Sequence, residues 1–419
     1  MYKESKYNQF IEFDGKSILY NFLSSAMVEI DKKKFYEKLT QANNKDDEFL
    51  LLHDYGFIDK CNEQINQVLN SYDKEKNDKR TMNITIELTN SCNFRCKYCY
   101  QEHLTNFIDK DKSDNIIKMI NNKIEDGIIA LHIHWFGGEP TLNLNQALYL
   151  DNVIKDVCEK NGVKYTASMT TNGYTIKENY PKLSLLKIDN FQITLDGIEP
   201  YHDFTRHLEN GQATFKKILD NIKFLDDEGY SVVIRYNVNK RNYKIKEFID
   251  LIKNQRFSSN IKLHIQGTNK FENSDEVDDL YFEDTKDYSK YLLKIYEDLK
   301  DENYEIPKYK NFGTNCSFDC MNNFYINSEL KILRCSSCDN SKESQIATIK
   351  DGTLVFNKEA LDKKEKYIGF EKDKCEECNM LPICKGGCYL KHSLNQDECI
   401  PEKYFVKDYV RLLYEQAKR

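Results

Sequence analysis

Hydrophobic and polar positions along the centre of the chain follow two periods in turn, one typical of strands and one typical of helices. The predicted strands are Ile84–Leu88, Ile129–Trp135, Tyr165–Met169, Phe191–Leu195, Val232–Tyr236 and Ile261–Ile265. Amphipathic segments between and after them predict helices near 113–125, 145–160, 212–226, 243–254 and 284–299. Repeated alternation of this kind favours parallel strands joined by right-handed crossovers. The sequence therefore predicts an α/β fold whose main domain, residues 81–305, is a partial (β/α)6 TIM-like barrel, with its site at the carboxyl ends of the strands.

The first 80 residues show a different order, in which strands come before helices. Strand-like runs cover Phe10–Phe13, Ser17–Tyr20 and Met27–Ile30, and helical patterns follow near 32–41, 46–55 and 61–72. The charged stretch 73–80 has no apolar face and is interpreted as a linker. Residues 1–80 are thus predicted to form a small separate domain.

Charge and hydropathy exclude two classes of partner. The chain carries 61 basic and 68 acidic residues, a net charge of −7, and no Lys/Arg block typical of nucleic-acid binding. No apolar run approaches the roughly 18 residues that a membrane helix needs, and the start lacks the apolar segment of a signal peptide. We therefore expect a cytoplasmic protein that binds neither nucleic acid nor membrane.

The 14 cysteines favour metal binding, because a chain without an export signal stays where thiols are reduced. They are unevenly placed, with three in Cys92–Cys99 and nine in Cys316–Cys399, while Cys61 and Cys158 stand alone. The second group defines a predicted third domain, residues 306–419.

The first group, Cys92, Cys96 and Cys99, follows the first predicted strand directly. Three thiolates can hold three irons of a cubane and leave the fourth iron open to another ligand. A structural zinc site would need a fourth protein ligand, for which His103 is the nearest candidate. Both alternatives remain open on spacing alone, and the iron–sulfur cluster is preferred.

This segment resembles the radical S-adenosylmethionine (radical SAM) superfamily, whose signature is C-x3-C-x2-C with an aromatic residue, here Tyr98, before the last cysteine. The resemblance implies a [4Fe–4S] cluster that binds S-adenosylmethionine and cleaves it to a 5′-deoxyadenosyl radical. It also implies that the chain is an enzyme, a radical SAM oxidoreductase.

Further motifs of that superfamily are matched at the later strand ends. The resemblance implies that S-adenosylmethionine contacts the segment Gly137, Gly138, Glu139 and Pro140 after the second strand, Asn172 after the third, and Thr194 and Arg206 at the fourth. Ordinary turns are the alternative for the glycine segment and for Asn172. His202 and Asp203 are interpreted as polar turn residues.

The nine C-terminal cysteines are too many for one cubane, and two clusters would use eight of them. Their spacing resembles the SPASM extension, which carries two auxiliary [4Fe–4S] clusters and so gives three in all. The resemblance implies one cluster held by Cys375, Cys378, Cys384 and Cys399, and another held by Cys316, Cys320, Cys335 and Cys388. Cys338 is left over, the hairpin at 327–330 lacks the usual glycine, and a pair of zinc ribbons is the alternative.

Enzymes with SPASM extensions usually modify peptides, so the resemblance implies a peptide substrate and a reducing electron donor such as flavodoxin or ferredoxin. Residues 1–80 resemble the winged-helix element that captures the leader of a precursor peptide by strand addition. A structural cap on the barrel is the alternative for this segment. Our leading hypothesis is a maturase that installs a thioether or carbon–carbon cross-link in a ribosomally synthesised precursor peptide.

Two other functions remain open. One is an anaerobic sulfatase-maturating enzyme, which oxidises a Cys or Ser to formylglycine; the extra N-terminal segment argues against it, as does Ser336, which stands where an acidic base is expected. The other is a non-catalytic iron–sulfur electron carrier, which would need neither the glycine segment nor Asn172.

Overall fold

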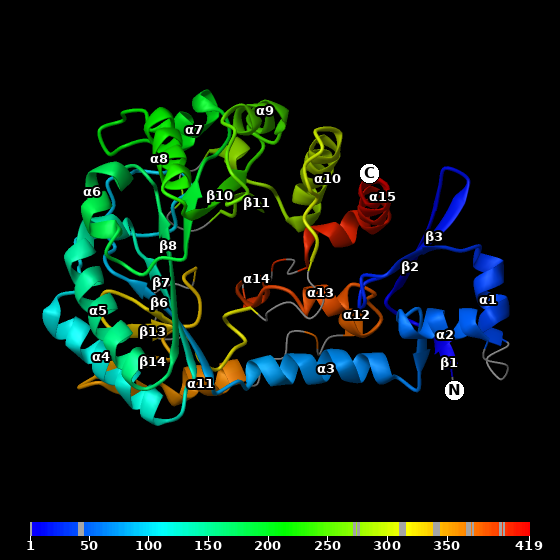
Figure 1. Cartoon of the computed structure of the whole chain (residues 1–419), viewed down its shortest axis with the longest axis horizontal. Coiled ribbons are helices and arrows are strands. Elements are labelled where there is room, and N and C mark those ends of the chain that lie inside the picture. The colour runs from blue at the N-terminus through cyan, green and yellow to red at the C-terminus, as the bar shows by residue number, and fades with distance from the viewer. Residues whose placement is uncertain are drawn as a thin grey trace. The chain divides into compact units, whose positions relative to one another are not determined.

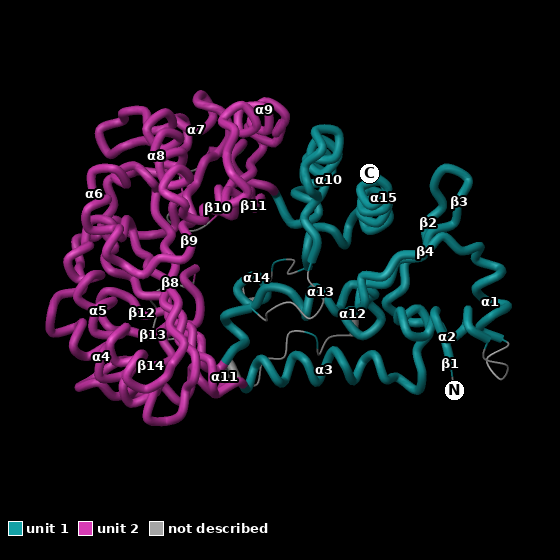
Figure 2. The backbone as a smooth tube through the Cα atoms, in the orientation of Figure 1, with its two compact units in different colours: residues 1–77, 283–320, 367–419 teal, residues 78–282, 321–366 magenta. Residues whose placement is uncertain are grey.

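The computed structural model describes residues 2–40, 46–270, 274, 277–309, 316–337, 344–365, 370, 373–393, 396 and 399–419, so Cys338 lies outside the described residues. The chain divides into two compact units (Figure 2). Unit 1 comprises residues 1–77, 283–320 and 367–419, and unit 2 comprises residues 78–282 and 321–366. The division of the sequence into domains at residues 80 and 305 stays a prediction.

Unit 2 is built on six parallel strands in the order β11-β10-β9-β8-β7-β6. The strands are β6 (Thr81–Glu87), β7 (Ala130–Phe136), β8 (Lys164–Thr171), β9 (Asn190–Thr194), β10 (Ser231–Val238) and β11 (Ile261–Gly267). Each overlaps one of the predicted strands, so the predicted α/β fold is confirmed.

Helices follow each of these strands, and α4, α5, α6 and α8 line the outer side of the sheet in Figure 1. The helices after the strands are α4 (Lys110–Glu125), η1 (Pro140–Asn143), α5 (Leu144–Lys160), α6 (Ile176–Leu183), α7 (Glu199–Thr205), α8 (Phe215–Asp227), α9 (Lys246–Asn254) and η2 (Asp278–Leu280). In β7, Leu131, Ile133 and Trp135 are buried and alternate with half-buried His132 and His134. One face of the strands thus packs in the apolar core, and the other carries polar side chains.

Four short strands extend the same sheet beyond β6. The sequence analysis expected a hairpin at 327–330 but assigned no strands in this region. They are β12 (Asn323–Ile326), β13 (Lys331–Leu333), β14 (Ala347–Lys350) and β15 (Thr353–Phe356), followed by α11 (Lys358–Glu365). β12 pairs parallel to β6, and the remaining pairs are antiparallel. The hairpin that lacks glycine places Leu330 in the left-handed region at φ 62°.

The N-terminal part of unit 1 contains a three-stranded sheet, β2-β3-β4, and a two-stranded sheet, β1-β5. Its elements are β1 (Tyr2–Glu4), β2 (Asn8–Phe13), β3 (Lys16–Asn21), β4 (Met27–Glu29), α1 (Lys32–Thr40), α2 (Asp47–Asp54), β5 (Ile58–Lys60) and α3 (Glu63–Lys76). The three predicted strands and three predicted helices are confirmed, whereas β1 and β5 were missed. The linker prediction is wrong as far as Lys76, because α3 continues to that residue.

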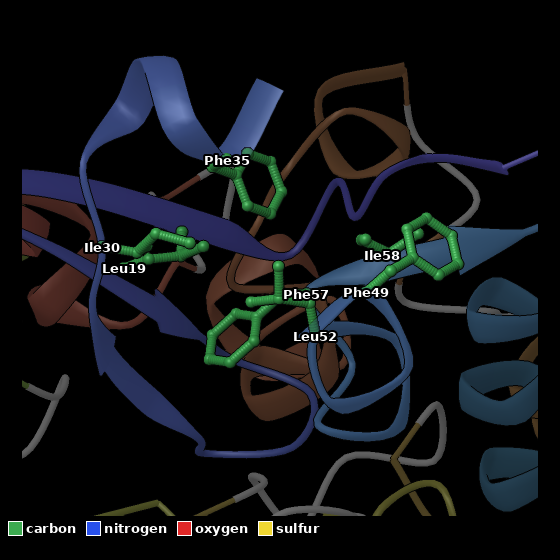
Figure 3. Packing of buried hydrophobic residues seen from close by; sticks show 7 residues of the cluster. All are labelled: Leu19, Ile30, Phe35, Phe49, Leu52, Phe57 and Ile58. Atoms are coloured by element: carbon green, nitrogen blue, oxygen red, sulfur yellow. The ribbon is translucent and has the colours of Figure 1, made fainter. Parts of the chain in front are cut away.

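A compact apolar cluster holds this N-terminal part together (Figure 3). It consists of Leu19, Ile30, Phe35, Phe49, Leu52, Phe57 and Ile58. Its members come from the three-stranded sheet, from both short helices and from β5, so each element buries its apolar side against the others.

The C-terminal part of unit 1 packs against the three-stranded sheet β2-β3-β4. Its elements are α10 (Thr285–Asp301), α12 (Asp373–Glu376), α13 (Leu381–Cys384), α14 (Tyr389–Ser393), η3 (Pro401–Phe405) and α15 (Val406–Ala417). The Tyr414 hydroxyl on α15 donates to Glu29 Oε1 at 2.6 Å, and the Tyr296 hydroxyl on α10 donates to Glu402 at 2.6 Å. Across the described part of the chain, no helix is both long and apolar enough to cross a membrane.

Candidate functional site

The cysteine loop that follows β6 brings Cys92, Cys96 and Cys99 into one half-buried segment. The Cys99 amide donates to the Cys96 carbonyl at 3.0 Å, and the Arg95 guanidinium donates to the Cys92 carbonyl at 2.9 Å. Backbone and side chain therefore fold the loop back on itself at the carboxyl end of the first parallel strand.

The glycine segment after β7 is bonded directly to this loop. The Gly138 amide donates to the Thr89 carbonyl at 2.8 Å, and the Glu139 amide donates to the Ser91 carbonyl at 2.9 Å. A Cβ at position 138 would lie 2.3 Å from the Ser91 oxygen, which is closer than any side chain tolerates. Glycine is needed here because two backbones meet.

Glu139 is fully buried and joins the ends of β7 and β8. Its carboxylate accepts hydrogen bonds from the Thr141 amide and hydroxyl, from the Thr171 hydroxyl at 2.6 Å and from the Asn172 amide at 2.7 Å. Burial raises the pKa of this carboxyl, while these bonds oppose the shift. In the described structure the Glu139 carboxylate links the ends of β7 and β8 through these hydrogen bonds.

Asn172 reaches the cysteine loop from the end of β8. Its Nδ2 donates to Asn93 Oδ1 at 2.7 Å and lies 4.0 Å from Cys92 Sγ. The structure therefore brings together the cysteine loop, the glycine segment and Asn172, as the motif spacing predicted.

A buried polar network supports the loop from the fourth and fifth strands. The Tyr98 hydroxyl donates to Asp196 and accepts from Arg206 Nη1 at 3.0 Å and from Asn237 Nδ2 at 3.1 Å. Burial raises the pKa of both Tyr98 and Asp196. Asp196 and Asn237 were missed from sequence, although each polar residue stands at a strand end, which was the available signal.

Arg206 has a second unusual feature. Its Nε is buried without a hydrogen-bond partner in the described part of the chain, and its guanidinium lies 5.6 Å from the Phe94 ring centroid. A buried donor without a partner costs free energy unless a ligand accepts from it. Arg206 therefore has capacity to bind an anionic group.

The remaining predicted residues of this region lie close by. Thr194 is buried at the end of β9. His202 Nδ1 accepts a hydrogen bond from the Asp196 amide at 3.2 Å. Asp203 accepts from the Thr214 and Phe215 amides at the start of α8. His202 and Asp203 lie within α7, so their interpretation as turn residues is wrong, and their side chains bond to the neighbouring segments instead.

Burial raises the pKa of all three loop thiols, to about 12 for Cys92, where Glu139 adds to the shift. Without a metal these thiols stay protonated at neutral pH, so metal binding must displace protons. Three soft donors beside an unpartnered guanidinium nitrogen suit a cluster with one open iron that holds a carboxylate ligand. The residues present therefore fit a [4Fe–4S] cluster with S-adenosylmethionine.

Unit 1 contains a separate pocket surrounded by thiols, with about 350 Å³ of space including some open to solvent. Its lining includes Cys375, Cys378, Cys384 and Cys399. Lys403 Nζ lies 3.3 Å from Cys399 Sγ, and burial raises the pKa of Cys384 to about 12. In the described ranges no three His, Cys, Asp or Glu side chains gather around one metal-ion position.

The other four predicted auxiliary ligands divide between the units. Cys316, Cys320 and Cys388 belong to unit 1, where Phe318 stacks on Tyr389 with 3.8 Å between ring centroids. This stack brings the turn that carries the first two cysteines beside the third. Cys335 belongs to unit 2, where the adjacent Ser336 side chain hydrogen-bonds to Tyr100.

Comparison with known proteins gives matches over much of the chain. Residues 86–254 match the radical SAM superfamily. A cysteine-type anaerobic sulfatase-maturating enzyme of Clostridium novyi is 27% identical over 72% of this chain and 85% of its own length. A probable GTP 3′,8-cyclase of Sulfolobus acidocaldarius is 31% identical, but the match covers 45% of this chain and 58% of that protein.

Two solved structures share the fold. The structure of native anSMEcpe with bound AdoMet and Cp18Cys peptide aligns with a TM-score of 0.63 at 18% identity, over 81% of this chain and 99% of that one. Streptococcus suis SuiB bound to precursor peptide SuiA aligns with a TM-score of 0.56 at 15% identity, over 96% of this chain and 98% of that one.

Proposed function

Because residues 86–254 of this chain form a radical SAM domain, we propose that the protein is a radical SAM maturase that cross-links a ribosomally synthesised precursor peptide. The bond formed is a thioether or a carbon–carbon bond. The enzyme abstracts a hydrogen atom from the peptide. Both units of the protein contribute residues to this function.

The observation that carries this proposal is the thiol-lined pocket of unit 1. An enzyme that only cleaved S-adenosylmethionine would need one cluster, whereas this chain offers four further thiols around one space. We assign an auxiliary [4Fe–4S] cluster to Cys375, Cys378, Cys384 and Cys399, and a second to Cys316, Cys320, Cys335 and Cys388. Together with the first cluster they make three, supplied with electrons by a flavodoxin or a ferredoxin.

The residues at the strand ends have distinct tasks in the first step. Cys92, Cys96 and Cys99 hold the first cluster, and Arg206 binds the methionine carboxylate through its unpartnered guanidinium nitrogen. Gly137, Gly138, Glu139 and Pro140 present backbone groups to the methionine amino group, while Asn172, Thr194 and Tyr98 contact the rest of the ligand. When bound, the cluster and S-adenosylmethionine supply a 5′-deoxyadenosyl radical that abstracts hydrogen.

The N-terminal part of unit 1 supports recognition of a peptide leader. β4 is one of the two end strands of its sheet, and an end strand offers free backbone groups for strand addition. The likeness to SuiB bound to precursor peptide SuiA extends over 96% of this chain and thus includes most of this segment. We propose that the leader adds along β4.

Formylglycine formation is the second candidate function, favoured by the 27% identity to the sulfatase-maturating enzyme of Clostridium novyi. That reaction needs a base near the substrate thiol or hydroxyl. At the expected position this chain has Ser336, whose side chain is engaged by Tyr100. A neutral hydroxyl is a poor base at pH 7, so cross-linking is preferred.

Co-expression with the candidate precursor peptide, followed by mass spectrometry, tests the proposal. We expect a loss of about two daltons per modification, because a cross-link removes two hydrogens. The Cys92→Ala variant is the control and should leave the peptide unmodified. An aldehyde on a sulfatase peptide, with no change in the precursor peptide, would replace cross-linking by formylglycine formation.

A further inference from the structure

A continuous series of hydrogen bonds runs along the polar face of β7 and β8. Gln192 Nε2 donates to Thr170 Oγ1 at 3.2 Å, and Thr170 Oγ1 lies 3.0 Å from His134 Nε2. His134 Nδ1 lies 2.8 Å from Ser168 Oγ, which lies 2.9 Å from His132 Nε2. His132 Nδ1 ends the series 2.9 Å from Thr166 Oγ1. Hydroxyl and imidazole groups, which both donate and accept, therefore alternate along the strands.

These bonds are consistent with two directions, and one of them suits the outward passage of a proton. In that direction the Thr170 hydroxyl accepts from Gln192 Nε2 and donates its hydrogen to His134 Nε2. A neutral imidazole that accepts at Nε2 carries its hydrogen on Nδ1, and His134 therefore donates to Ser168. The same rule repeats from Ser168 through His132 to Thr166. In this direction every donor in the series points away from the carboxyl ends of the strands.

The two ends of the series lie in different surroundings. Thr170 directly precedes Thr171 and Asn172, which belong to the site, whereas Thr166 lies four residues earlier in β8, about 13 Å along the strand. Beyond it, Asp189 favours the protonated form of His132, is partly exposed and pairs with Lys187. The series thus runs along β7 and β8 from the strand ends that carry the site toward the opposite end of the sheet.

We propose that Thr170, His134, Ser168, His132 and Thr166 relay a proton out of the active site when the cross-link forms. This inference rests on the proposed function. Joining R–H to R′–XH removes two hydrogens, of which the 5′-deoxyadenosyl radical takes one as an atom. The other leaves as a proton through the relay, and its electron passes to an acceptor of the iron–sulfur class.

The state of the imidazoles agrees with a relay. Burial lowers the pKa of His134 to about 4, with His132 adding to the shift, and burial also lowers the pKa of His132. Both rings are therefore neutral at pH 7 and can accept at one nitrogen while they donate from the other. A ring that stayed protonated would block the series.

Replacing Ser168 interrupts the relay between the two imidazoles without changing either ring. With reconstituted enzyme and the precursor peptide, Ser168→Ala should lower the cross-linking rate by about 100-fold without reducing 5′-deoxyadenosine formation. Ser168→Thr keeps the hydroxyl and should restore most of the rate. Thr85→Ala removes a hydroxyl from β6 outside the series and serves as the control. If Ser168→Ala matches Thr85→Ala, or if Ser168→Thr fails to rescue, the relay is overturned.

A second readout does not depend on the substrate. In protein labelled with ¹⁵N-histidine, both rings should carry hydrogen on Nδ1, and Ser168→Ala should shift the resonances of both rings at once. Hydrogen on Nε2 of either ring would break the direction and refute the relay. If the wild-type enzyme cross-links no peptide while the tautomers are as expected, the proposed function fails and not the hydrogen-bond series.

Discussion

At the scale of single residues, the site depends on two backbones that meet at Gly138. The amide of this residue bonds to Thr89, and the place of a Cβ is taken by the Ser91 carbonyl oxygen. The glycine motif was recognisable in the sequence, but its contact with the cysteine loop was not, because the partners lie some 47 residues apart and meet only in the folded sheet.

Gly138→Ala is therefore expected to displace the cysteine loop, at a cost of about 1–3 kcal/mol from overpacking. We expect the variant to lose 5′-deoxyadenosine formation and the iron of the first cluster, measured after anaerobic reconstitution. Gly162→Ala is the control, because no atom lies within 4 Å of the added Cβ and φ of +65° alone sets its cost. Full activity of Gly138→Ala would show that the contact is dispensable.

His134 gives a second test through pH. Its pKa is about 4 in the folded chain and near 6.5 when unfolded, so the unfolded chain binds more protons between these values. Stability should therefore fall as pH decreases from 7 to 5, by about 2 kcal/mol from this group. In His134→Gln that contribution should disappear, measured as a smaller difference between unfolding free energies at pH 7 and pH 5. An unchanged difference would contradict the assigned environment of the ring.

At the scale of elements, strands with a strong hydrophobic periodicity were predicted from the sequence, and strands with a weak one were missed. All six parallel strands were predicted because each carries apolar residues at strand-like positions between amphipathic helices, although those of β11 are not buried. β1 and β5 were missed because a strand of three residues is too short to show a period. Of β12 to β15, only the hairpin between β12 and β13 was expected, because these short strands are placed by pairing with β6 and with one another rather than by their own pattern.

The edge strand β4 carries the prediction at this scale. Hydrogen bonds join Ile30 to Ser17 and Ala26 to Asn21, so the alternation of the antiparallel pair turns the Met27 amide away from β3. Met27→Pro removes that donor while leaving the bonds to β3 in place. We expect leader affinity to fall about tenfold, measured by fluorescence anisotropy with a labelled leader peptide. Met27→Ala keeps the amide and should bind as the wild type does; equal binding by both variants would exclude strand addition at β4.

At the scale of the whole molecule, the proposed function predicts three iron–sulfur clusters per chain. Three cubanes give about twelve irons per chain after reconstitution. Cys384→Ala should lower the count to about eight while 5′-deoxyadenosine still forms, because the first cluster lies in the other unit. Cys158→Ala removes a buried thiol of α5 that belongs to none of the proposed clusters, so this variant should keep the full iron count. About four irons with zinc in the wild type would identify zinc ribbons.

The most direct measurement follows hydrogen from the peptide into 5′-deoxyadenosine. Reconstituted enzyme is incubated with S-adenosylmethionine, a reductant and a precursor peptide deuterated at its α-carbons and side chains, and both products are analysed by mass spectrometry. The proposed function predicts one deuterium transferred per cross-link and a cross-linked peptide that has lost one further hydrogen as a proton. Deuterium-free 5′-deoxyadenosine, or a peptide aldehyde in place of the cross-link, would contradict it.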